Sequence, residues 1–160
     1  RPMRELILLR HAHAEPATTG QSDLDRPLSP QGLAEAEAVA RWLKEQGLVP
    51  DRVLCSPARR TRETLEAVMD AIGYVEQRLE ERIYEATPGT LADLADQHRE
   101  AERLLLVGHN PGLEQLAALM YSGVTSEYRG MPPAGVVVLT LPADASFEPG
   151  VAQLSAFWWP

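Results

Sequence analysis

An arginine and a histidine follow the first strongly apolar stretch of the chain. Residues 6–9 read Leu-Ile-Leu-Leu, a pattern typical of a strand that is buried on both faces. Arg10 and His11 come directly after this stretch. Open α/β sheets place their ligand crevice at the carboxyl ends of parallel strands, so His11 is a candidate for chemistry. The alternative is that Arg10 and His11 simply begin a solvated loop.

A second apolar strand, residues 104–107, also ends in a histidine, His109. Ser56-Pro57 and Asn110-Pro111 each join a capping side chain to a proline, which predicts that a helix begins there with proline at its first position. Free N–H groups and the helix dipole make such helix starts anion sites. We therefore expect this edge of the sheet to bind an anion. The alternative for His109 is that it is an ordinary cap residue.

Three arginines, Arg59, Arg60 and Arg62, cluster where the second helix is expected to begin. Cations are unfavourable at that end of the helix dipole, and a bound anion would explain them. The alternative is a solvated face that pairs with Glu63 and Glu66. Because three arginines share one turn, we expect some of them to have only this role.

Other reactive side chains have simpler interpretations. Cys55 ends an apolar run and is expected to fill the core, because buried thiols distant from a base are inert. His98 lies on the apolar face of a predicted helix and is interpreted as a core or boundary residue. His13 follows His11 by two residues, so we expect its side chain to point away from the candidate site.

The elements that must position these residues alternate between strand and helix, which predicts an α/β fold with a largely parallel sheet. The predicted strands are residues 6–9, 52–55, 74–79 and 104–107, and the predicted helices begin after Ser29, after Ser56, near Thr90 and after Asn110. Residues 15–28 form a long polar loop, and such loops commonly serve a site. Residues 136–141 and 151–159 predict a hairpin or an antiparallel edge, with the aromatic residues 157–159 covering a helix face or forming a surface patch for a partner.

Composition narrows the class of protein. The 160 residues are 44% hydrophobic and 24% charged, and we expect one domain over residues 1–160. The formal net charge of −8 argues against general affinity for nucleic acid or anionic membrane. Apolar stretches fall short of the ~20 residues that span a bilayer, and no signal segment is recognised at the start. With one cysteine and therefore no internal disulfide, we expect a cytoplasmic protein, and nothing requires more than a monomer.

An ordered set of motifs resembles a known family. Leu9-Arg10-His11-Ala12 resembles the Arg-His-Gly signature of the histidine phosphatase superfamily, the phosphoglycerate mutase-like proteins. Four further motifs follow in the same order as in the SixA-type phosphohistidine phosphatases, and the resemblance spans about residues 4–141. These motifs are Asp25-Arg26-Pro27-Leu28-Ser29-Pro30-Gln31-Gly32, Ser56-Pro57-Ala58-Arg59-Arg60-Thr61-Arg62-Glu63-Thr64, Tyr84-Glu85-Ala86-Thr87-Pro88 and Val107-Gly108-His109-Asn110-Pro111-Gly112.

The resemblance implies a three-layer fold with a mostly parallel central sheet, and a metal-independent phosphatase that needs no cofactor. It implies that His11 is the nucleophile that becomes phosphorylated, that Arg10 and Arg60 bind phosphate, and that His109 is the second active-site histidine. Glu81 matches the proton donor of the mutases and larger phosphatases, although small members vary there. The implied substrate is a phosphorylated protein, such as a His-containing phosphotransfer domain, or a small phosphate ester.

The loops 15–28 and 80–89 are too short to form a cap domain, so we expect an open, shallow pocket. One departure from the signature is Ala12, which stands where the family has glycine. A methyl group there narrows the backbone's freedom but removes no catalytic group.

Two rival functions stay open at this point. A metallohydrolase would use His11, His13 and His109 together with Asp23 or Asp25 as ligands. A non-enzymatic domain would bind phosphate or a phosphoprotein without hydrolysis.

Overall fold

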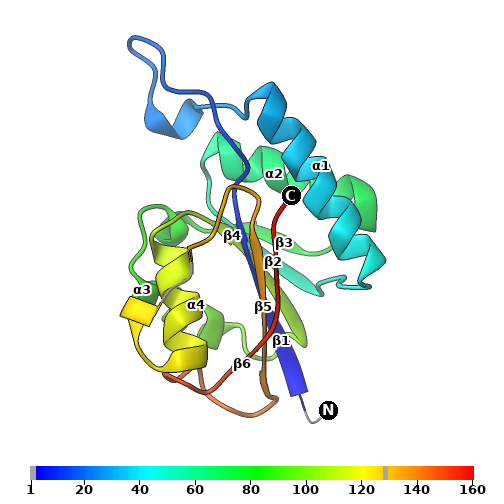
Figure 1. The fold of residues 1–160 in the computed structure, drawn as a ribbon, viewed down its shortest axis with the longest axis vertical. Helices are drawn as coiled ribbons and strands as arrows, with labels where there is room; N and C mark the ends of the chain where they lie inside the picture. The colour runs from blue at the N-terminus through cyan, green and yellow to red at the C-terminus, as the bar shows by residue number, and fades with distance from the viewer. Residues whose placement is uncertain (1–2, 128–129) are drawn as a thin grey trace.

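A six-stranded sheet lies at the centre of the computed structural model, which describes residues 3–127 and 130–160 (Figure 1). The strand order is β3-β2-β4-β1-β5-β6, so β4 and β1 are the two central strands of the sheet. Strands β1 to β4 run parallel, whereas β5 and β6 are antiparallel to their neighbours. The strands are β1 (Met3–Arg10), β2 (Arg52–Cys55), β3 (Gln77–Leu79), β4 (Arg103–Gly108), β5 (Val136–Pro142) and β6 (Gln153–Trp158).

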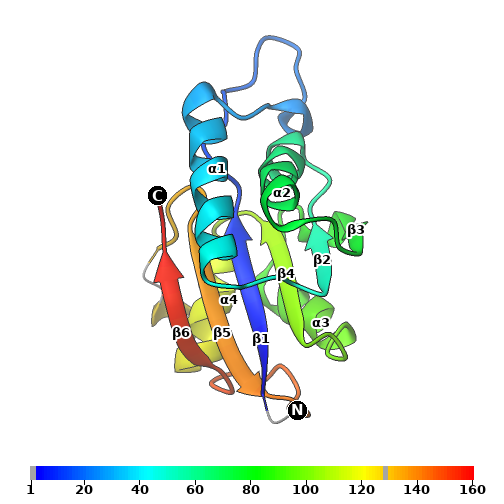
Figure 2. The same cartoon turned by 90° about the vertical axis from the view of Figure 1, so that its right-hand side faces the viewer.

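Two helices cover each face of this sheet (Figure 2). Helices α1 (Pro30–Glu45) and α2 (Arg59–Ile72) pack on one face, and α3 (Pro88–Gln97) and α4 (Gly112–Ser122) on the other. The predicted three-layer α/β fold is therefore confirmed. Among residues 3–127 and 130–160, no helix is both long enough and apolar enough to cross a membrane.

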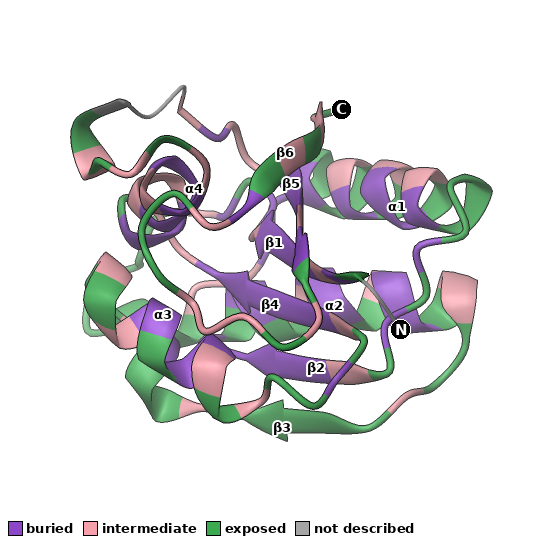
Figure 3. Cartoon of the chain, turned by 90° about the horizontal axis from the view of Figure 1, so that it is seen from below, coloured by how far each residue is buried: buried purple, intermediate pink, exposed green. Residues whose placement is uncertain are grey.

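Strand β1 shows why the first apolar run is continuous. Ile7 and Leu9 face the α1–α2 layer, Leu6 and Leu8 face the α3–α4 layer, and all four side chains are fully buried. A strand covered on both faces has no position that favours a polar residue until it ends. The central strands are accordingly buried in Figure 3, whereas the short edge strand β3 is exposed.

The carboxyl-terminal part forms the predicted hairpin. Strand β5 pairs antiparallel with β1, and β6 pairs antiparallel with β5. The ring of Trp158 stacks on Trp42 of α1, with the ring centroids 5.4 Å apart. One of the three terminal aromatic residues thus covers a helix face as predicted, while Trp159 is about half exposed.

The predicted start of α2 was wrong by two residues, and the predicted start of α4 was wrong by one. Helix α2 begins at Arg59 after Ala58, and α4 begins at Gly112 after Pro111, so neither proline takes the first helical position. Both side chains still accept a local N–H, Ser56 Oγ from Ala58 and Asn110 Oδ1 from Glu114 in the first turn of α4. Each also makes a tertiary contact: Ser56 Oγ lies 2.8 Å from His109 Nε2, and Asn110 Nδ2 donates to the carbonyl of Met131 at 2.9 Å. Both helices nevertheless begin at the carboxyl edge of the sheet, because each follows a parallel strand.

Cap-plus-proline starts occur at the two other helices. Ser29 Oγ accepts from the Gly32 N–H before α1, as predicted. Thr87 Oγ1 accepts from the Thr90 N–H, so α3 begins at Pro88 rather than near Thr90. A side-chain oxygen that satisfies an otherwise unpaired N–H fixes the first turn of each helix.

Candidate active site

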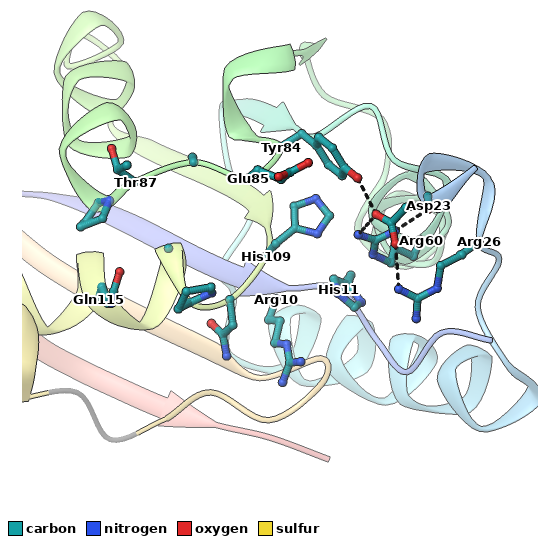
Figure 4. A pocket seen from close by; sticks show the side chains of 15 residues that line it. Arg10, His11, Asp23, Arg26, Arg60, Tyr84, Glu85, Thr87, His109 and Gln115 are labelled. Atoms are coloured by element: carbon teal, nitrogen blue, oxygen red, sulfur yellow. Dashed lines mark hydrogen bonds and ion pairs between the residues drawn. The ribbon is translucent and has the colours of Figure 1, made fainter. Parts of the chain in front are cut away.

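A cavity of about 820 Å³ opens at the carboxyl edge of β1 and β4 (Figure 4). It collects side chains from the two strand ends, the loop 15–28, the start of α2 and the loop 80–89. Four of the five predicted site residues line it, namely Arg10, His11, Arg60 and His109. The other lining residues are Asp23, Arg26, Tyr84, Glu85, Ala86, Thr87, Pro88, Asn110, Pro111, Gly112 and Gln115.

His11 is held by the backbone on both sides. Its N–H donates to the carbonyl of Gly108 at the end of β4, and its carbonyl accepts from the N–H of Ala134. Its ring Nδ1 lies 2.7 Å from the carbonyl oxygen of Ala12. Because a carbonyl oxygen only accepts, Nδ1 carries the proton and Nε2 keeps a free lone pair. The fold thus fixes the tautomer that can attack an electrophile.

His109 faces His11 across the cavity, with ring centroids 5.3 Å apart. The hydroxyl of Ser56 lies 2.8 Å from its Nε2, and the ring of Tyr84 meets it edge-on at 5.5 Å. These contacts set the ring orientation. Ser56, which the sequence suggested only as a helix cap, therefore positions the second histidine.

Burial makes both imidazoles neutral at physiological pH. The pKa of His11 is lowered to about 4, mainly by burial and also by the nearby Arg60 and Arg10 guanidinium groups, while the Ala12 hydrogen bond opposes the shift. The pKa of His109 is lowered to about 3 by burial, then by His11 and Arg60. A neutral imidazole is the nucleophilic form, so this environment keeps His11 reactive.

Two arginines bring positive charge to the same cavity. Arg10 donates from Nη1 to the carbonyl of Met131 at 2.8 Å, and among the described residues it forms no ion pair. Arg60 is buried, with an exposed fraction of 6%, and donates to both the backbone and the carboxylate of Asp23. The other two arginines of the cluster do not line the cavity: Arg59 pairs with Glu63, and Arg62 donates to Pro57 O.

Sequence reasoning missed the residues that organise the loop side of the cavity. Asp23, which it considered only as a metal ligand, forms ion pairs of 3.0 Å with both Arg26 and Arg60 and accepts a hydrogen bond of 2.5 Å from Tyr84. The Tyr84 hydrogen bond, supported by Arg26 and Arg60, holds the pKa of Asp23 well below its usual range although burial opposes this. The sequence feature that could have indicated Asp23 was the long polar loop 15–28, which contributes Asp23 and Arg26 to the cavity.

Several predicted candidates lie elsewhere. Glu81 is exposed and does not line the cavity. His13 is also outside it, with Nδ1 2.6 Å from Ser29 Oγ, as its two-residue offset predicts. His98 is a boundary residue beside Arg52. Burial raises the pKa of the Cys55 thiol to about 12, as expected for a core residue.

Of the ligands expected for the rival metal site, His11, His109 and Asp23 line the cavity but do not form a metal-binding arrangement. Within the described ranges, no group of three or more His, Cys, Asp or Glu side chains is arranged to hold a metal ion. Asp23 is instead used by two arginines and a tyrosine.

Comparison with known proteins places this geometry in a family. The family model of the histidine phosphatase superfamily (branch 1) matches residues 6–119, and the chain belongs to this superfamily. The phosphohistidine phosphatase SixA of Escherichia coli is 32% identical over 127 residues, 76% of each chain. An uncharacterized protein of Mycobacterium tuberculosis is 36% identical over 162 residues, covering 95% of this chain and 99% of that one.

A crystal structure from Agrobacterium tumefaciens, of a protein provisionally named phosphohistidine phosphatase SixA, superposes with a TM-score of 0.85. The two chains are 31% identical, and the match covers 98% of each. The phosphoglycerate mutase-like fold implied by the motifs is thereby confirmed, together with the predicted family.

Proposed function

We propose that this chain is a phosphatase that transfers a phosphoryl group to Nε2 of His11 and then releases it to water. The observation that carries this proposal is the state of His11: it is neutral, its Nδ1 proton is directed to Ala12, and it lies between two arginines and a second histidine. An uncharged nucleophile avoids the repulsion that a phosphate dianion exerts on hydroxide. The P–N bond to His11 forms as the bond to the leaving group breaks, and water later cleaves it.

The surrounding groups suit the transition state of phosphoryl transfer. Arg10 and Arg60 can bind the equatorial oxygens of the phosphoryl group, and His109 can donate a further hydrogen bond. Stabilising charge on these oxygens is most of what phosphoryl transfer requires of a protein. In this proposal no metal ion takes part, because the fixed cations supply the positive charge.

The identity of the leaving group follows from the available acids. An alkoxide needs a proton from a general acid, whereas an imidazole leaves more readily. Glu81 lies outside the cavity, Asp23 is held anionic by its three donors, and Glu85, the other carboxylate of the lining, is exposed to solvent. We therefore favour a phosphohistidine substrate, in keeping with the name of the E. coli relative. A small phosphate ester is the second candidate, and a non-catalytic phosphate-binding domain the third.

The partner in this proposal is a phosphorylated protein, such as a His-containing phosphotransfer domain of a signalling pathway. The protein would act as a cytoplasmic monomer. The absence of a cap domain over the described cavity leaves room for a side chain presented on another protein's surface.

The test compares hydrolysis of a phosphohistidine protein with hydrolysis of a panel of small phosphate esters. His11→Ala is expected to abolish turnover, and His13→Ala, an exposed histidine two residues away, is expected to retain it. Acid-labile label on the intact protein, but not on His11→Ala, would identify the intermediate. Activity that is lost in EDTA and restored by zinc would support the metallohydrolase instead, and phosphate binding without hydrolysis of any substrate would support the binding domain.

A further inference from the structure

Glu85 has an unusual backbone conformation at the edge of the cavity. Its φ is +55°, and Ala134 is the other non-glycine residue with positive φ in the described part of the chain. Side chains other than glycine, asparagine and aspartate rarely adopt this left-handed region, because Cβ crowds the backbone. Such conformations persist where the surroundings enforce them, and they concentrate at functional sites.

The residues on either side of Glu85 enforce this conformation. Ile83 is buried against Gly108, where an added Cβ would lie 2.9 Å from Cγ2 of Ile83. The carbonyl of Ala86 packs against Gly112, where an added Cβ would lie 2.5 Å from that oxygen. Two glycines of the Gly108–Gly112 motif thus let the loop approach closely on both sides of Glu85. The loop between these two contacts has little freedom to turn elsewhere.

The resulting turn leaves the Glu85 side chain exposed and lining the cavity. Figure 4 shows it beside Tyr84 on the same loop, on the side of the cavity toward which the His109 ring points. Asp23 and Glu85 are the two carboxylates among the described lining residues, and they differ in their partners. Asp23 is engaged by Arg26, Arg60 and Tyr84, whereas Glu85 forms no hydrogen bond or ion pair with the described residues.

An unpaired carboxylate is unfavourable for binding an anion alone, because it repels the phosphoryl group that the arginines attract. The repulsion is offset when the substrate also carries a positive charge beyond the phosphorus. We propose that Glu85 is a specificity residue that selects phosphoryl compounds with a cationic leaving group, such as a protonated imidazole or an ammonium, and disfavours anionic ones. This inference rests on the proposed phosphatase function and narrows its substrate class.

The experiment uses three phosphate esters that differ in the charge of the leaving group: phosphoethanolamine, phenyl phosphate and phosphoglycolate. Glu85→Gln removes the charge and retains nearly the same shape. We expect kcat/KM to fall about fivefold for the cationic ester, to rise about fivefold for the anionic one, and to stay within twofold for the neutral one. Glu37→Gln, which removes an exposed carboxylate on α1 distant from the cavity, is the matched control and should change none of the three.

Glu85→Lys extends the test by reversing the charge, and it should make phosphoglycolate the preferred ester. Equal changes for all three esters in Glu85→Gln, or the same response from Glu37→Gln, would overturn the charge-selection role. If the unmodified protein hydrolyses none of the three esters and no phosphohistidine protein, the proposed function itself fails. The activity of the unmodified chain thus distinguishes failure of the charge-selection role from failure of the proposed phosphatase function.

Discussion

The phenol of Tyr84 donates a hydrogen bond of 2.5 Å to Oδ2 of Asp23, and this bond joins two loops that are 61 residues apart in the sequence. One loop follows β1 and the other follows β3, so the contact closes one wall of the cavity between them. The same carboxylate also pairs with Arg60. Arg60, one of the two arginines proposed to bind phosphate, is therefore oriented by both loops at once.

Tyr84→Phe removes the hydrogen bond and keeps the ring against His109. We expect kcat/KM for a phosphate ester to fall about five- to tenfold, because the wall that orients Arg60 is loosened. Steady-state kinetics measure this ratio. Tyr74→Phe removes a phenol that is 84% exposed and outside the cavity, and it serves as the control. Equal effects of the two variants would contradict the structural role assigned to the Tyr84–Asp23 bond.

Neighbouring arginines at the start of α2 should differ sharply in importance. Arg60→Ala is expected to lower kcat by about 10²–10³, because it removes a cation that, in the proposed mechanism, stabilises the transferred phosphoryl group. Arg59→Ala removes an exposed side chain paired with Glu63 on the same helix, and should change kcat less than about twofold. The comparison requires kcat for both variants on one substrate. A large loss in Arg59→Ala would show that the assignment within the cluster is wrong.

The stability of the fold should depend on pH through the two cavity histidines. Both have a folded-state pKa, about 4 for His11 and about 3 for His109, that lies below the ordinary value of about 6.5 expected in the unfolded chain. Below pH 6.5 the unfolded state therefore binds more protons, and the free energy of unfolding decreases as the pH falls toward 4 and then 3.

Urea unfolding at pH 7 and pH 4.5 tests this linkage. The decrease in the free energy of unfolding between these pH values should be smaller in His11→Asn than in the unmodified chain, by about 2 kcal/mol. If His11→Asn shows the same decrease as the unmodified chain, His11 is not held neutral by the fold.

Ala12, which replaces the glycine of the family signature, has a packing role. Its side chain is fully buried with the α1–α2 layer of the core, and its φ is not positive, so the backbone does not require glycine there. Ala12→Gly is expected to lower the free energy of unfolding by about 1 kcal/mol, through a lost methyl contact and a more flexible unfolded chain. Thermal or urea unfolding measures the loss, while kcat should stay within about twofold. A large fall in kcat would indicate that the methyl group orients His11.

The parts of the site that lie on strands were predictable, and the parts that depend on loops meeting each other were not. Arg10, His11 and His109 follow apolar runs whose burial fixes where the strands end. Asp23 and Glu85 lie in polar loops without periodicity. The partners of Asp23, and the glycines Gly108 and Gly112 that shape the turn at Glu85, are distant from them in the sequence. The starts of α2 and α4 were misplaced for a related reason, since Ser56 and Asn110 combine a local contact of the cap type with a tertiary contact.

Strand β1 leads directly to His11 and is hydrogen-bonded on both sides, to β4 and to β5, with its apolar side chains fully buried. Amide protons of such a strand exchange with solvent only when the whole domain opens, whereas those of the exposed edge strand β3 exchange through local fraying. The strand that supports His11, the proposed nucleophile, is therefore in the last part of the molecule to open. A partly unfolded molecule would lose its loops and β3 before the strand that carries the proposed chemistry.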